Sequence, residues 1–175
     1  TRQLTNLNDV EQSLINKIED SILVDLSKAA SALPVKNTDV TALDWVNGRR
    51  TPDADQSVAM AITGMKMGTD APQFFKALVE ATAFGARAIT ERFQSEGVPI
   101  ESVVVIGGIS KKSDYVMQTC ADVWNCPIDV LESEQSCALG AAIMAAVSAG
   151  EYATVADAQQ VMASAVCHQY LPNPE

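Results

Sequence analysis

The spacing of apolar residues predicts a long helix near the beginning of the sequence. Four of them recur at intervals of four residues, which places them on one face of a helix: Leu14, Ile18, Ile22 and Leu26. We expect this helix over residues 8–33, with Pro34 after its end. Residues 34–56 are dense in turn formers and predict a loop, interrupted by an apolar patch at 42–46. A weak helix or turn is expected over residues 58–67.

A second long helix is predicted over residues 70–95. Thr69 or Asp70 caps its first free amides, and Pro72 fits the first turn, where no amide partner is required. Apolar and small residues at spacings of three or four give it one packing face: Phe75, Leu78, Thr82, Gly85, Ile89 and Phe93. Charged residues occupy its other faces: Lys76, Glu80, Arg87, Glu91 and Arg92.

The following part of the chain alternates between strand and helix patterns. The β-branched run at 102–106 predicts a strand buried on both faces, and residues 127–131 predict a second strand. Helices are expected over residues 113–124 and 136–149. Such alternation is typical of parallel strands joined by right-handed crossovers.

A last helix is predicted to open at Thr154 or Asp157, since either residue can cap it. Its apolar residues are Val155, Val161 and Val166. The whole pattern therefore predicts an α/β fold, rich in helix, with a short parallel sheet. Two or three strands leave open edges, so we expect further sequence to complete this sheet.

The composition is that of a folded domain. The 175 residues are 47% hydrophobic and 19% charged, and no apolar run approaches the roughly 20 residues of a membrane helix. Twelve Lys and Arg residues against 22 Asp and Glu residues give a net charge of −10, which disfavours nucleic acid as a partner. We expect a cytoplasmic protein with reduced thiols, because its four cysteines form no C-x-x-C pair and no zinc-ligand group: Cys120, Cys126, Cys137 and Cys167.

The most informative segment follows the strand at 102–106. Gly107 and Gly108 end this strand, and a polar loop with Lys111 and Lys112 leads to the next helix. Ligands of open α/β sheets lie at such carboxyl ends of strands, and glycines let a base or phosphate approach the backbone. A tight turn without a ligand explains the two glycines equally well. The spacing is neither that of a Rossmann fingerprint nor that of a P-loop.

Two further segments are candidates for a site. Residues 132–142 open a helix of small residues that another backbone or a ligand can approach, with close helix–sheet packing as the favoured interpretation. Cys137 lies at the start of that helix, where a thiol can act as a nucleophile, but His168 is the one histidine in the sequence and lies far along the chain. The loop at 43–52 holds a Trp, an Asp and two Arg, which either bind a polar ligand or pin the loop to the core.

Four segments match, in the same order, the motifs of one known protein family. They are ALDWVNGRRTP at 42–52, ATAFG at 81–85, IGGISKKS at 106–113 and SEQSCALGAA at 133–142. These segments resemble the carboxy-terminal domain of the FGGY carbohydrate kinases, and the likeness covers nearly the whole chain. Four ordered motifs are a specific signal, whereas the Gly-Gly turn alone is not.

The resemblance implies an actin-like, ribonuclease-H-like ATPase domain, one of two that close over ATP, Mg²⁺ and a sugar. The glycine turn would be the adenosine motif, and residues 138–142 would belong to a helix behind the nucleotide cleft. Lys112 or Ser113 stands where relatives often have an asparagine that reaches the nucleotide. The residues that the resemblance assigns to cofactor binding are Gly107, Gly108, Ser110, Lys112 and Ser113.

By the same resemblance, residues 1–175 are an incomplete carboxy-terminal domain. Its first strands are expected outside this sequence, together with the whole amino-terminal domain, which binds most of the sugar and carries the catalytic Asp. We therefore assign no catalytic residue and no metal ligand to this chain, and we expect the fragment alone to transfer no phosphate.

The implied reaction is phosphorylation of a ketopentose by ATP, namely of L-ribulose at its 5-hydroxyl, as in L-arabinose catabolism. One alternative is a xylulose or glycerol specificity within the same family. Another is a non-catalytic nucleotide-binding module of the actin-like fold. The sequence leaves the oligomeric state open, a homodimer included.

Overall fold

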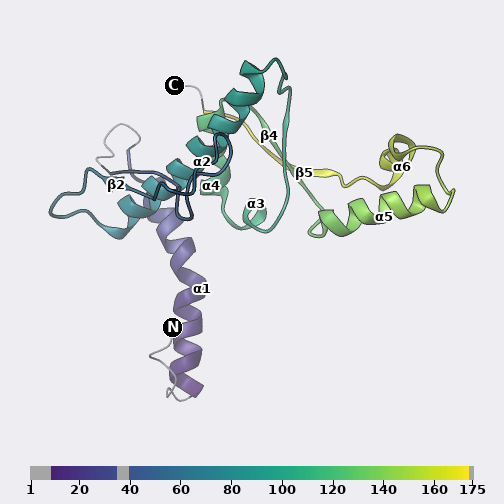
Figure 1. Ribbon diagram of the computed structural model, residues 1–175. Helices are drawn as coiled ribbons and strands as arrows, with labels where there is room; N and C mark the ends of the chain where they lie inside the picture. Colours follow the sequence, from purple (N-terminus) through teal and green to yellow (C-terminus); the bar gives the residue numbers. More distant parts are fainter. Residues whose placement is uncertain (1–8, 35–39, 174–175) are drawn as a thin grey trace. The chain divides into compact units, whose positions relative to one another are not determined.

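The computed structural model of the chain describes residues 9–34 and 40–173, and Figure 1 shows its helices and strands. The chain divides into two compact units, which comprise residues 1–82 and residues 83–175. Helix α2 (Ala71–Ser95) gives its first part to the first unit and its second part to the second.

Helix α1 (Asp9–Ser31) confirms the first predicted helix, although the expected start at residue 8 lies outside the described residues. Its apolar stripe is not buried within the described part of the chain. The exposed fractions are 58% for Leu14, 52% for Ile18 and 49% for Ile22. The periodicity therefore identified the helix correctly, while the surface that would cover its apolar face is not among the described residues of its unit.

In the first unit, a two-stranded sheet joins the two ends of the loop between residues 42 and 62. Strands β1 (Thr41–Ala42) and β2 (Ile62–Thr63) pair antiparallel, with Ala42 opposite Ile62. The helix or turn expected over residues 58–67 is wrong at this strand, because the β-branched pair Ile62-Thr63 is held by its nonlocal partner rather than by local periodicity. The small core beside this sheet consists of Val40, Ala42, Ala77 and Ala81, with Ile62 packed against it.

Helix α2 begins as predicted. The Asp70 carboxylate accepts a hydrogen bond from the Gln73 amide at 3.0 Å, and the Asp70 amide donates to the Gln73 side chain at 2.9 Å. This reciprocal pair satisfies two amides at the helix start. Pro72 is the second residue of the helix.

The packing face predicted for α2 is wrong. Leu78 and Phe93 are 36% and 48% exposed, whereas Ala77 and Ala81 are buried together with Lys76. Alanines let a neighbouring backbone approach closely, and the Lys76 ammonium stays paired because Glu80 lies 3.0 Å away, one turn further on. The buried face of this helix therefore consists of alanines together with Val79 and the paired Lys76, and it leaves Leu78 and Phe93 outside.

A three-stranded mixed sheet forms the centre of the second unit. Strand β3 (Val103–Val105) pairs parallel with β4 (Ile128–Leu131), and β4 pairs antiparallel with β5 (Val166–Tyr170). Figure 1 shows β4 and β5 side by side. The parallel pair confirms the predicted alternation, whereas the expectation of a purely parallel sheet is wrong at β5, which returns antiparallel beside β4. The expectation that Val166 belongs to the last helix is wrong, because the chain turns back there and hydrogen-bonds to β4.

Four helices accompany this sheet, and three of them match predicted ones. They are α4 (Asp114–Trp124), α5 (Ser136–Ser148) and α6 (Val155–Met162), the last opened by a capping box of Thr154 and Asp157. The fourth, α3 (Ile109–Lys112), is a single turn within the predicted polar loop. Figure 1 shows α5 and α6 lying next to each other.

The core of the second unit lies between α4, the sheet and the second part of α2. Its buried residues are Ala83, Met117, Cys120, Ala121, Ile128, Val130 and Tyr170. The Trp124 indole donates a hydrogen bond of 2.9 Å to the Ala83 carbonyl and so joins α4 to α2. All four cysteines are free thiols.

Strand β3 is not buried on both faces within the described residues. Val104 is 52% exposed, and Ile106 after it is 48% exposed. The outer edge of β3 carries no further strand in the described part of the chain, since the sheet order is β3-β4-β5. The prediction of a doubly covered strand is therefore wrong for this chain by itself.

Two isoleucines of the second unit allow a matched test of this core. Ile128 is completely buried and Ile106 is half-exposed. We expect Ile128→Ala to lower the free energy of unfolding of the chain by about 2–5 kcal/mol, because it leaves a cavity. The control Ile106→Ala should cost below about 1 kcal/mol. Urea titration of both variants measures the difference, and equal losses would contradict the assigned core.

Candidate functional site

The glycine turn follows directly from strand β3. Gly107 has a φ of +98°, a left-handed conformation that favours glycine, and Gly108 begins α3 with a φ of −65°. Both residues are exposed. Because β3 and β4 are parallel, their carboxyl ends meet at one edge of the sheet, where open α/β sheets hold their ligands.

Ser110 braces this turn from inside. Its side chain is almost completely buried, and its hydroxyl donates a hydrogen bond of 2.7 Å to the Gly107 carbonyl. Ser113 caps α4, because its hydroxyl accepts a hydrogen bond of 3.3 Å from the Val116 amide in the first turn of this helix. The two predicted serines are therefore occupied in holding the turn and the helix that follows it.

The two glycines differ in what they require. A Cβ at Gly107 would meet no atom of the described residues within 4 Å, so the left-handed backbone explains this glycine. A Cβ at Gly108 would fit an ordinary right-handed backbone and would approach only the Lys112 side chain, at 4.0 Å. Neither conformation nor packing among the described residues requires a glycine at position 108. The turn thus has an open face where the backbone of Gly108 is accessible.

The side chains of the two lysines in this turn have different contacts. The Lys111 ammonium donates a hydrogen bond to the Glu132 carbonyl in the loop after β4, and it lies 3.9 Å from the Glu134 carboxylate. The Lys112 side chain makes no hydrogen bond or ion pair within residues 9–34 and 40–173, and its stem lies beside Gly108. The free positive charge next to Gly108 is therefore that of Lys112.

The start of α4 carries its own negative charge. Asp114 is the first residue of this helix, and its carboxylate accepts a hydrogen bond of 2.7 Å from the Tyr170 hydroxyl on β5. Burial, and then the hydrogen bond to Asp114, raise the pKa of Tyr170 to about 12. The amino terminus of a helix carries a partial positive charge, and at α4 this charge is partly met by the Asp114 carboxylate.

The second candidate segment leads from β4 into α5. The Glu132 amide donates to the Ala165 carbonyl at 2.8 Å, and the Ser133 amide donates to the Ser164 hydroxyl at 2.8 Å. The small residues of α5 are exposed rather than packed against the sheet: Ala138, Gly140, Ala141 and Ala142. The favoured interpretation of close helix–sheet packing is therefore wrong for the described chain.

The cysteine of that segment has no catalytic partner in the part of the chain that the structure describes. Cys137 is exposed in the first turn of α5. His168 lies on β5, where its ring packs edge-on against Tyr170 with 4.4 Å between the centroids. No group of three or more His, Cys, Asp or Glu side chains suited to a metal ion occurs among the described residues.

The third candidate segment is a self-contained loop of the first unit. The Arg49 guanidinium lies over the Trp45 ring, 5.6 Å from its centroid, and donates a hydrogen bond of 2.7 Å to the Asp53 carbonyl. The backbones of Arg49 and Asp55 pair with each other. A Cβ at Gly48 would lie 2.6 Å from the Gln56 backbone, so the loop closes tightly there. These contacts favour the structural interpretation of this segment over ligand binding.

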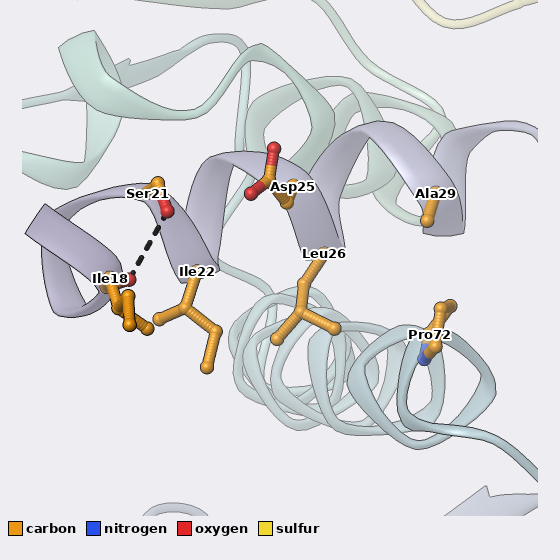
Figure 2. Close-up of a pocket in the computed structure, with 7 residues that line it drawn as sticks. All are labelled: Ile18, Ser21, Ile22, Asp25, Leu26, Ala29 and Pro72. Carbon is orange, nitrogen blue, oxygen red and sulfur yellow. Dashed lines mark hydrogen bonds between the residues drawn. The ribbon is translucent and has the colours of Figure 1, made fainter.

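An open pocket of about 300 Å³ lies in the first unit beside α1 (Figure 2). It is lined by one face of α1 and by Pro72 at the start of α2: Ile18, Ser21, Ile22, Asp25, Leu26 and Ala29 from α1. Its surface is mainly apolar, and none of the candidate nucleotide residues lines it. Among the described helices, none is both long and apolar enough to span a bilayer.

Solved structures identify the class of this fold. The xylulose kinase from Rhodospirillum rubrum matches with a TM-score of 0.75 at 20% identity, over 93% of this chain and 32% of that one. The Plasmodium falciparum glycerol kinase solved with ADP matches with a TM-score of 0.73 at 22% identity, over 95% and 32%. The chain therefore has the actin-like, ribonuclease-H-like fold of sugar kinases. Residues 3–149 match the family described as FGGY family of carbohydrate kinases, C-terminal domain, and the chain belongs to this family.

Similar sequences are ribulokinases. That of Vibrio parahaemolyticus is 50% identical over 159 residues, which are 91% of this chain and 28% of the relative. That of Bacillus licheniformis is 39% identical over 159 residues, 89% of this chain and 29% of the relative. The chain thus spans less than a third of the length of these relatives. The predicted resemblance to FGGY kinases is confirmed.

The five predicted nucleotide residues lie within residues 107–113 of the sequence, and the structure shows that their surroundings differ. Gly108 and Lys112 lie at the open face, whereas Ser110 is buried beneath the turn. The sequence placed Lys111 beside Lys112 as a second positive charge of the loop and gave Asp114 no role. The adjacent lysines were visible in the sequence, but their different directions depend on the pairing of β3 with β4.

The contact between Tyr170 and Asp114 predicts a loss of stability at alkaline pH. Because the folded state holds the pKa of Tyr170 near 12, above its unfolded value near 10, its contribution is complete below pH 10 and is lost as the pH rises toward 12. We expect Tyr170→Phe to lower the free energy of unfolding by about 1–2 kcal/mol at pH 8. The gap to the wild type should shrink at pH 11. Urea titrations at both pH values measure it, and a constant gap would contradict the role of this hydroxyl.

Proposed function

We propose that this chain forms the adenosine side of the ATP site in an ATP-dependent sugar kinase. The observation that carries the proposal is Gly108, a glycine that neither its backbone conformation nor its neighbours require. Its missing side chain is explained if a flat ligand lies against the backbone there. The position of this turn at the carboxyl end of a parallel strand, in a member of the FGGY family, supports an adenosine as that ligand.

Within this site, we assign direct nucleotide contacts to Gly107, Gly108 and Lys112. The Lys112 ammonium has no partner in the described residues and is available to a nucleotide oxygen. Ser110 and Ser113 act on the nucleotide through the backbone, because their hydroxyls already hold the turn and the start of α4.

The Mg²⁺ that accompanies ATP is not assigned to this chain. Its ligands of choice are carboxylate oxygens and phosphates, and the described residues contain no suitable cluster. We likewise place no catalytic residue here, since no candidate segment pairs a nucleophile with a base. Phosphoryl transfer depends mainly on positioning and charge neutralisation, and this chain would contribute the positioning of the nucleotide.

The substrate that we propose is L-ribulose, phosphorylated at its 5-hydroxyl in the cytoplasm by the full-length protein. The support is the 50% identity to a ribulokinase over 91% of the chain. The sugar would be bound mainly by an amino-terminal domain outside residues 1–175, of which this chain is the carboxy-terminal counterpart. The structural similarity to xylulose and glycerol kinases makes these specificities the alternatives to test.

A coupled assay of ADP release tests this function. With the full-length kinase, we expect turnover with L-ribulose that exceeds turnover with xylulose or glycerol. The 175-residue chain alone should show no sugar-dependent ADP release, because the family resemblance assigns the catalytic Asp to the amino-terminal domain. A full-length protein that binds ATP but phosphorylates none of the three sugars would favour a non-catalytic nucleotide-binding module instead.

Substitution of Gly108 tests the position of the nucleotide. In the full-length kinase, Gly108→Val should raise the KM for ATP about tenfold or more, while the KM for the sugar changes much less. Its melting temperature should stay close to that of the wild type, because a side chain fits the local backbone and meets open space.

Gly107→Val is the matched control, since it forces a branched side chain into a left-handed backbone. It should lower the melting temperature as well as the affinity for ATP. If Gly108→Val lowers only the melting temperature and leaves the KM for ATP unchanged, the adenosine site does not lie at this turn.

A further inference from the structure

Lys111 links the two loops that follow the parallel strands. Its ammonium donates a hydrogen bond to the Glu132 carbonyl, directly after β4, and lies 3.9 Å from the Glu134 carboxylate. Its side chain is 29% exposed, although it lies on a surface turn. One end of this link is the helical turn that carries Gly108, and the other is the loop that opens α5.

Each loop is also held separately. The glycine turn is braced by Ser110, and the loop after β4 is tied to the segment before β5 through the amides of Glu132 and Ser133. None of these bonds joins one loop to the other. The hydrogen bond of Lys111 does, so it adds a direct link between the two loops to the pairing of β3 with β4.

From this arrangement we propose that Lys111 is a positioning residue of the nucleotide site, one that fixes the glycine turn against the loop before α5 without touching the nucleotide. The inference rests on the proposed function. The two adjacent lysines then have different roles. The Lys112 ammonium interacts with the ligand, whereas the Lys111 ammonium binds the Glu132 carbonyl of the chain itself.

The carbonyl bond, rather than the ion pair, carries this role. Glu134 is 80% exposed, and an ion pair so open to water contributes little. The Glu132 carbonyl is a backbone acceptor directly after β4, and the side chains of Ile128 and Val130 anchor this strand in the core. An arginine at position 111 keeps donors for this carbonyl, whereas a methionine keeps the length of the side chain and removes them.

The test uses four variants of the full-length kinase, each with separate KM values for ATP and sugar, kcat, and melting temperature. We expect Lys111→Met to raise the KM for ATP about fivefold with less than a twofold change for the sugar. Lys111→Arg should restore the KM for ATP to within about twofold of wild type, and Glu134→Gln should stay within the same limit.

Hydrogen exchange separates positioning from direct contact. In Lys111→Met without nucleotide, the amides of Gly107 to Ile109 and of Ser133 to Gln135 should both exchange faster. In Lys112→Met they should exchange as in the wild type, although its KM for ATP rises. Should Lys111→Met not be recovered folded, Lys111→Leu replaces it with the same expectations, since leucine also has no donor.

An unchanged KM for ATP in Lys111→Met, a failure of Lys111→Arg to restore it, or unchanged exchange in both loops would overturn the proposal. Failure of the proposed function is a different result, because it would show as a wild-type kinase that neither binds nor consumes ATP. In that case the exchange of the two loops still decides whether Lys111 couples them.

Discussion

The parallel pairing of β3 with β4 is the constraint on which the candidate site depends. With Val103 opposite Ile128 and Val105 opposite Val130, both strands end at the same edge of the sheet. The glycine turn and the loop before α5 therefore become neighbours although helix α4 separates them along the chain. The buried side chains of Ile128 and Val130 hold β4 in this register, because a shift by one residue would turn them away from the core.

Local patterns predicted the helices well. The four-residue spacing in α1, the Asp70–Gln73 capping pair of α2 and the capping box of Thr154 and Asp157 are all properties of adjacent residues. Such signals need no knowledge of the rest of the fold. The family resemblance was accessible for the same reason, since each of its motifs is a short continuous segment.

Nonlocal contacts explain what the sequence did not predict. Strand β5 continues from a helical pattern, and only its antiparallel pairing with β4 makes it a strand. The packing face of α2 is decided by the close approach that its alanines permit rather than by the hydrophobicity of Leu78 or Phe93. In the site, the burial of Ser110 and the bond from Lys111 to Glu132 require knowledge of which loops lie together.

The apolar side chains left uncovered on α1 and beside β3 have a colloidal consequence. Ile18, Val104 and Ile106 are each about half-exposed in a chain whose net charge is −10. At low ionic strength, the repulsion between copies of like charge opposes contact between these surfaces. At about 1 M salt the Debye length falls to about 3 Å, and this protection is largely removed. In dilute buffer, charge repulsion is therefore a force that opposes contact between the exposed apolar surfaces of separate copies.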